Sequence, residues 1–144
     1  MSSAELKVRR IHPLAKLPAY AHEGDAGLDL FSVEDAVIPP SRSALIKTGI
    51  QLELPSNTEA QIRPRSGLAL NHQVTVLNSP GTIDRGHRGE IRVILINHGD
   101  EPFTVYAGLK IAQLVVSPVL TISVVEGVEL SATDRGDGFG SSGM

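Results

Sequence analysis

The sequence contains no cysteine and no tryptophan, and aromatic residues make up only 3% of its 144 positions. The lack of cysteine excludes disulfide bonds and thiolate metal sites. Because aromatic rings are scarce, a core must be built from Val, Ile, Leu and Ala, and branched side chains of this kind favour β-strands. A chain of this length buries about 68–70% of its unfolded surface, so a single domain can form a core without disulfides or structural metal.

Long apolar runs and an excess of positive charge are absent as well. No apolar stretch approaches the ~20 residues of a membrane span, and residues 1–10, MSSAELKVRR, lack the apolar core of a signal peptide. We therefore expect a cytoplasmic protein without a membrane partner. The formal net charge of −3 argues against nucleic-acid binding through a broad positive field. Any anionic ligand must be met by local cations.

Arginines that can meet such a ligand gather around one carboxylate. Residues 78–93 read NSPGTIDRGHRGEIRV, which places Asp84 among Arg85, Arg88 and Arg92. A guanidinium group binds two phosphate oxygens at once, and its charge favours the ionised form of a nearby carboxylate. The glycines of this stretch permit a tight loop around a bound group. The pattern predicts an anion site that contains a basic carboxylate, on a loop leading into a strand.

Much of the remaining sequence alternates between apolar and polar residues, as half-buried strands do. Turns rich in glycine or proline separate these segments at spacings of roughly 8–12 residues, which indicates one all-β domain, a sandwich, jelly roll or barrel. We expect strands at 5–11, 44–55, 59–63, 74–78, 91–97, 109–119 and 121–130.

Residues 68–73, LALNHQ, form the only candidate for a helical turn. If Ser66 caps this turn, its hydroxyl, free backbone N–H groups and Arg65 converge on an anion site. An ordinary strand-to-turn junction with a capping serine is the alternative. Asn78 can offer both a donor and an acceptor to the edge of a planar base. Gln113 is a long polar residue within an apolar strand, where a simple surface position is the alternative.

Five separated stretches resemble, in order, the five motifs of the trimeric deoxyuridine triphosphatases (dUTP diphosphatases). The resemblance implies an all-β, jelly-roll-like barrel or sandwich with one short helical turn, assembled as a homotrimer with shared active sites. It also implies a β domain over 1–133 and a flexible Gly/Ser-rich C-terminal arm over 134–144 that closes over the active site. The stretches are AGLDL at 26–30, PRSGLAL at 64–70, NSPGTIDRGHRGEI at 78–91, GLKIAQLVV at 108–116 and RGDGFGSSG at 135–143.

The same resemblance implies an enzyme that hydrolyses dUTP to dUMP and pyrophosphate with Mg²⁺. This reaction limits uracil incorporation into DNA and supplies dUMP for dTMP synthesis. Asp84 would be the general base that orients and deprotonates the water attacking the α-phosphorus. Asp29 would hold hydrated magnesium through water. A general base contributes about 10²–10⁴-fold, and electrostatic clamping of the phosphates a comparable or larger share.

Substrate contacts are implied by the same match of motifs. Asn78 would read the uracil edge, Phe139 would stack over uracil, and the serines and glycines of the arm would close over the triphosphate. The implied phosphate ligands are Arg65, Ser66, Gly67, Gln113 and Arg135; the implied base and sugar ligands are Thr82, Ile83, His87 and Arg92 with Asn78 and Asp84; and the arm adds Phe139, Gly140, Ser141 and Ser142.

Two positions depart from the family pattern. His87 stands where the family usually has a tyrosine beneath the deoxyribose, and a histidine ring is smaller and titratable. The arm is also one residue shorter than is common, because only 136–138 separate Arg135 from Phe139. Both departures concern contacts with the substrate, so they bear on sugar discrimination and on closure of the arm.

Three other functions fit the sequence less well. The related deoxycytidine triphosphate deaminases use a glutamate in the strand after the central motif, and the matching position here is Ile94. A nucleotide-binding trimer without catalysis would gain nothing from keeping both Asp84 and Asp29. A structural β-sandwich module would leave the arginine clusters and glycine turns unexplained. The triphosphatase reading accounts for all of these residues.

Overall fold

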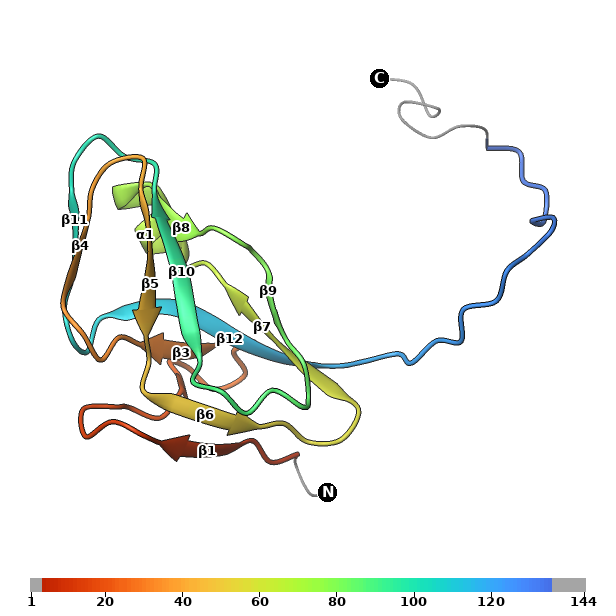
Figure 1. Ribbon diagram of the computed structural model, residues 1–144, viewed down its shortest axis with the longest axis horizontal. Helices are drawn as coiled ribbons and strands as arrows, with labels where there is room; N and C mark the ends of the chain where they lie inside the picture. Colours follow the sequence, from red (N-terminus) through yellow and green to blue (C-terminus); the bar gives the residue numbers. More distant parts are fainter. Residues whose placement is uncertain (1–3, 136–144) are drawn as a thin grey trace.

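The computed structural model describes residues 4–135, and its strands form antiparallel sheets around one core (Figure 1). As the sequence predicts, the regular elements of residues 4–135 are strands apart from one short helix. No helix in residues 4–135 has both the length and the hydropathy that crossing a membrane requires. In chain order the elements are β1 Lys7–Arg10, β2 Ala19–Tyr20, β3 Leu28–Phe31, β4 Ala36–Ile38, β5 Ser43–Lys47, β6 Ile50–Glu53, β7 Thr58–Arg63, α1 Ser66–His72, β8 Val74–Val76, β9 Gly81–Ile83, β10 Arg92–Asn97, β11 Phe103–Val105 and β12 Lys110–Pro118.

The largest sheet has the strand order β2-β3-β12-β7-β9, and a second sheet has the order β5-β10-β8. The pairs β1-β6 and β4-β11 complete the described structure. Strand β12 lies at the centre of the large sheet, between β3 and β7. The first, second, third and fourth motif stretches therefore meet on or beside this one sheet.

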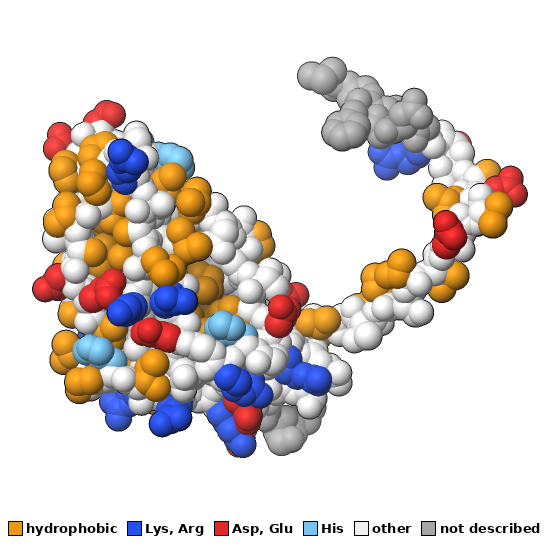
Figure 2. Space-filling view, in the orientation of Figure 1, with side chains coloured by type: hydrophobic (Ala, Val, Ile, Leu, Met, Phe, Trp, Pro, Cys, Tyr) orange, Lys and Arg blue, Asp and Glu red, His pale blue; other side chains and the backbone are white. Residues whose placement is uncertain are grey.

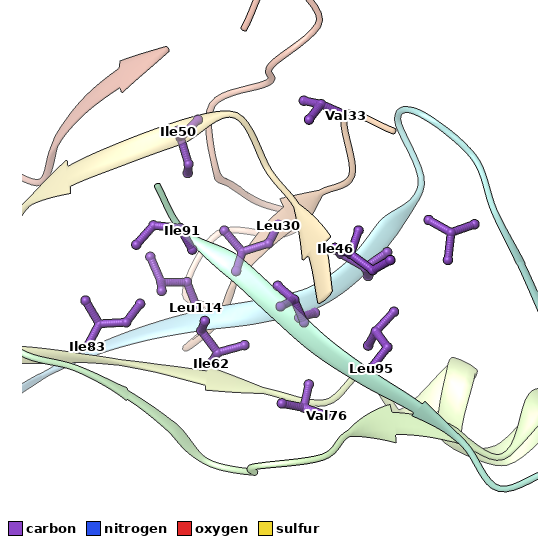
Figure 3. Close-up of a cluster of buried hydrophobic side chains, with 14 of the residues drawn as sticks. Leu30, Val33, Ile46, Ile50, Ile62, Val76, Ile83, Ile91, Leu95 and Leu114 are labelled. Carbon is purple, nitrogen blue, oxygen red and sulfur yellow. The ribbon is translucent and has the colours of Figure 1, made fainter. Parts of the chain in front are cut away.

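Apolar side chains from the two larger sheets point toward one another and form the core (Figure 3). The alternation in the sequence predicted this correctly, because Ile91, Val93 and Leu95 are all buried. Phe103 is the single aromatic residue among the buried side chains of the described part, so the core is aliphatic as its composition requires. Labelled members of the cluster in Figure 3 are Leu30, Val33, Ile46, Ile50, Ile62, Val76, Ile83, Ile91, Leu95 and Leu114.

The single strand expected over 44–55 is wrong, because the chain forms two strands, β5 and β6, that belong to different sheets. The break falls at Gly49, whose φ is +71°. A Cβ at this position would stand 2.8 Å from His12 Cβ, so a side chain is excluded by space as well as by backbone conformation. Beside it, the buried Thr48 hydroxyl donates to the Ile91 carbonyl oxygen. The alternating pattern continues across this corner and therefore hides it.

The strand expected over 121–130 is also wrong. After β12 the chain leaves the folded body, and residues 120–130, here termed the apolar segment, form no strand (Figure 1). Its side chains are almost fully exposed, at 90% for Val124 and 104% for Val128 (Figure 2). The composition suits a strand, but no described strand of the same chain pairs with the segment.

Candidate active site

Asp84 follows directly after β9, in a turn braced by the large sheet. Strand β9 pairs with β7, with Thr82 opposite Gln61, and the turn is closed by the His87 N–H, which donates to the Asp84 carbonyl oxygen at 3.0 Å. The sequence predicted a loop braced by a sheet at this place and missed the short strand inside it. The side chain of Asp84 is exposed to solvent, so it can reach a ligand.

A cavity of about 240 Å³ lies beside this turn. Its lining combines polar groups that can recognise a base and a sugar with apolar side chains from the two main sheets. The size suits part of a nucleotide, because pockets for whole drug-sized ligands usually reach about 300–1,000 Å³. The lining consists of Leu45, Ile62, Asn78, Gly81, Thr82, Ile83, Asp84, His87, Glu90, Ile91, Arg92 and Ile94.

Two glycines allow the cavity's polar groups to lie close to the backbone. A Cβ at Gly81 would stand 3.3 Å from Asn78 Nδ2, and a Cβ at Gly89 would stand 3.2 Å from His87 Cε1. Both distances are tighter than ordinary van der Waals contact. The glycines therefore let the Asn78 amide and the His87 ring pack against the loop.

The three arginines near Asp84 in sequence line different hollows in the structure. Arg92 lines the cavity with Asp84. Arg88 points to another hollow, where its Nη2 lies 3.7 Å from Glu53 Oε1 and its Nη1 donates to the Arg85 carbonyl oxygen at 2.7 Å. Arg85 lines this other hollow too. Of the three cations expected around Asp84, only Arg92 lines its cavity, and Arg88 pairs instead with a carboxylate on β6.

A second polar cluster forms where β3, β7 and β12 lie side by side. The Asp29 carboxylate lies 3.1 Å from Lys110 Nζ and 3.8 Å from Arg65 Nε. Arg65 Nη1 also donates to the Lys110 carbonyl oxygen at 3.3 Å, and Gln113 Nε2 donates to the Pro64 carbonyl oxygen at 2.9 Å. The structure thus brings together three residues selected from the sequence, Asp29, Arg65 and Gln113.

Lys110 belongs to this cluster and was not selected from the sequence. Strict alternation along a strand puts residues 110 and 113 on opposite faces, so Lys110 is not expected beside Gln113. The register between β12 and β3 shifts between Lys110 and Ala112, which makes Ile111 an extra residue. Such a bulge re-aims the side chains that precede it, and a regular sequence pattern does not reveal it.

Ser66 and Gly67 stand in the first turn of α1, next to Arg65. The expectation that Ser66 caps this helix is wrong: the N-cap residue is Arg65, in an extended conformation, and no side-chain capping bond is made. The helix thus begins at Ser66 itself and is anchored by buried Leu68.

The two clusters lie at opposite ends of β7. Ile83, which precedes Asp84, pairs with Ala60, whereas Arg65 follows the other end of the strand. Asp29, Arg65 and Gln113 accordingly do not line the cavity around Asp84. Arg135 is exposed in the segment that leaves the body. The predicted contacts of Phe139, Gly140, Ser141 and Ser142 lie outside the described residues.

The donor groups on the described residues bear on the metal implied by the family resemblance. No group of three His, Cys, Asp or Glu side chains in residues 4–135 is arranged to hold a metal ion. In the second cluster Asp29 is the one carboxylate, and two cations flank it. Mg²⁺ commonly keeps several waters and binds through one or two carboxylates and substrate phosphates. The cluster fits such a hydrated ion brought in with phosphate, and does not fit an ion held by protein groups alone.

Comparison with known proteins gives one consistent family. The sequence model of the dUTPase family matches residues 14–143. The chain is 64% identical over 140 residues to a deoxyuridine 5'-triphosphate nucleotidohydrolase of Clostridium acetobutylicum, covering 96% of this chain and 97% of that one. It is 62% identical over 140 residues to the protein of the same name from Alkaliphilus metalliredigens, again covering 96% and 97%.

Solved structures agree with the sequence relatives. A mutant dUTPase of Staphylococcus bacteriophage 80alpha with dUpNHpp has a TM-score of 0.90 at 26% identity, covering 99% of this chain and 100% of that one. A mutant dUTPase from phage phi11 of S. aureus, described with a structural Mg(II) ion, has a TM-score of 0.81 at 26% identity, covering 87% and 97%. These likenesses confirm the jelly-roll-like fold expected from the sequence.

Proposed function

Since the chain belongs to the dUTPase family, whose members hydrolyse dUTP, we propose that it converts dUTP to dUMP and pyrophosphate by attack of an Asp84-activated water on the α-phosphorus. The observation that carries this proposal is the cavity in which Asp84 adjoins Asn78, Thr82 and Ile83. If the cavity holds the base and the sugar of a nucleotide, a carboxylate at its edge can reach the α-phosphate.

Each lining residue has a chemical task in this proposal. The Asn78 amide offers a donor and an acceptor to the uracil edge. Thr82, Ile83 and His87 enclose the base and the deoxyribose, and Arg92 supplies a positive charge at the cavity wall. Asp84 orients the attacking water and accepts its proton, and the turn presents its carboxylate exposed to solvent, where a water molecule can reach it.

The second cluster holds the phosphate chain. Arg65 with Ser66 and Gly67 provides a guanidinium fork, a hydroxyl and backbone N–H groups, and Gln113 adds an amide. Asp29 would hold hydrated Mg²⁺ through water, and the ion when bound would neutralise charge on the phosphate oxygens. Arg135 and the arm residues Phe139, Gly140, Ser141 and Ser142 would close over the substrate and exclude water.

We propose a homotrimer in which each active site draws residues from more than one subunit. Asp84 and Arg65 lie at opposite ends of β7, so one chain does not bring the base and the phosphate ligands together. The chain also exposes apolar surface that a partner would bury. Leu45, which also lines the cavity, and Leu77 are half-exposed. The apolar segment is exposed along its length (Figure 2). Exposed apolar patches of this kind mark association surfaces.

A deaminase of the same fold is not favoured by the cavity. The position matched to the deaminase glutamate is Ile94, which lines the cavity as an apolar group and carries no proton to transfer. Incubation of the purified protein with MgCl₂ and dUTP, dCTP, dTTP or UTP tests the proposal. We expect dUMP and pyrophosphate from dUTP; dUTP formed from dCTP would instead indicate a deaminase, and the absence of dUTP turnover would refute the proposed function.

A further inference from the structure

Asp29 lies between two cations that contact different oxygens of its carboxylate. Lys110 Nζ is 3.1 Å from Oδ2, whereas Arg65 Nε is 3.8 Å from Oδ1. The Asp29 side chain is only 13% exposed, but that of Lys110 is 42% exposed. The Arg65 side chain is 34% exposed, so the closer cation is also the slightly more exposed of the two.

The bulge in β12 creates this contact. Lys110 is opposite Phe31, and Gln113 is opposite Asp29, although the two β12 residues are three positions apart. Directly opposed residues share a face, and Asp29 and Phe31 are two positions apart on β3, so Lys110 and Gln113 face the same side. Ile111 is the extra residue that makes this possible, and it is fully buried.

We propose that Lys110 is a positioning residue that holds the Asp29 carboxylate before substrate arrives and competes with the hydrated metal for it. This inference rests on the proposed function, in which Asp29 meets magnesium through water. An ammonium and a hydrated divalent cation would repel each other and would be attracted to the same carboxylate. Lys110 therefore keeps an otherwise largely buried charge paired in the free protein, at the expense of metal affinity.

The geometry indicates that Lys110, and not Arg65, gives way to the metal. Arg65 is tied to the backbone of β12 by its bond to the Lys110 carbonyl oxygen, and its contact with Asp29 is the longer of the two. The lysine ammonium sits on a flexible stem and is half-exposed, so it can turn to solvent without leaving a buried donor unpaired. Asp29 then keeps one cation and gains the hydrated ion.

The test measures how strongly metal and nucleotide favour each other's binding. The dissociation constant of dUpNHpp is measured with EDTA and with saturating MgCl₂, and the ratio of the two values gives the coupling. In Lys110→Met we expect this ratio to rise about tenfold over the unaltered protein, the size expected for one unit charge near a divalent ion at high dielectric. Lys110→Arg keeps the cation, so its ratio should stay close to the original value.

Lys7→Met is the matched control, because Lys7 pairs with Glu53 away from this cluster and its loss changes net charge equally. Its ratio should not change. If Lys110 acted on the phosphates alone, both dissociation constants of Lys110→Met would rise together and the ratio would be unaltered, which overturns the inference. A fall in the ratio overturns it as well. Neither result affects dUTP hydrolysis by the unaltered protein, so failure of the inference is separate from failure of the proposed function.

Discussion

Gly27 lies so close to Gln113 that a Cβ added at position 27 would stand 2.1 Å from Gln113 Oε1 and 3.1 Å from its Cβ. The other end of the same amide is fixed, because its Nε2 donates to the Pro64 carbonyl oxygen at 2.9 Å. Pro64 precedes Arg65, so this bond ties the amide to the segment that carries a proposed phosphate ligand. Gly27, which immediately precedes β3, therefore leaves the space in which the Gln113 amide can bond to Pro64.

Gly27→Ala should lower kcat/KM for dUTP by about ten- to a hundredfold, because the amide of Gln113 must move and a misplacement of about 1 Å at a site can cost this much. The free energy of unfolding should fall by less than about 2 kcal/mol, since Gly27 is only half-buried and a flexible side chain can yield. Steady-state kinetics and thermal unfolding check the two parts.

A double-mutant cycle provides the control for this substitution. If Gly27 acts through Gln113, then Gly27→Ala should have little further effect on kcat/KM in a Gln113→Ala background. Independent, additive losses from the two substitutions would show that Gly27 acts in some other way.

His87→Tyr should raise the preference for dUTP over UTP, measured as the ratio of the two kcat/KM values, by about tenfold. His87 lies at the cavity wall against Gly89, and a larger ring there would occupy space that a ribose 2'-hydroxyl needs. His87→Phe separates ring size from the phenolic hydroxyl. An unchanged ratio in both variants would mean that position 87 does not discriminate between the sugars.

Deletion of residues 134–144 should reduce turnover of dUTP strongly while leaving the melting temperature nearly unchanged. The deleted stretch has few apolar residues to contribute to a core, yet it contains Arg135 and Phe139, which are proposed to contact substrate. Normal hydrolysis by the shortened protein would remove the arm from the mechanism.

Deletion of residues 120–144 should abolish the proposed trimer, because it removes the apolar segment whose side chains are exposed in the single chain. Light scattering after size-exclusion chromatography gives the mass directly. The variant lacking only 134–144 serves as the control and should remain trimeric. A 120–144 deletion that keeps the mass of the full-length assembly would show that this segment does not hold the subunits together.

The aliphatic core was predictable because it depends on local alternation, and Ile91, Val93 and Leu95 are buried as their spacing indicates. The corner at Gly49 was not, since the alternation of β5 continues into β6 although the strands belong to different sheets. The unpaired state of residues 121–130 also has no local signal: their composition suits a strand, and pairing depends on whether an edge is available.

The candidate site also has parts that the sequence predicts and parts that it does not. Motif order selected Asp29, Arg65 and Gln113, and these lie together. Lys110 was not predicted from the sequence, because its place beside Asp29 depends on a bulge, which is a non-local feature of strand register. The separation of Asp84 from Arg65 was equally invisible, because it follows from antiparallel pairing of β9 with β7.

The Asp84 carboxylate is proposed to activate the attacking water, and the Asp84→Asn variant tests this role most directly. Asn has nearly the same shape but does not act as the base, so we expect dUTP turnover to fall by about 10²–10⁴-fold. The dissociation constant of dUpNHpp should change little, and Asp100→Asn, an exposed carboxylate away from the cavity, should behave as the unaltered protein. Turnover by Asp84→Asn at the original rate would contradict the mechanism.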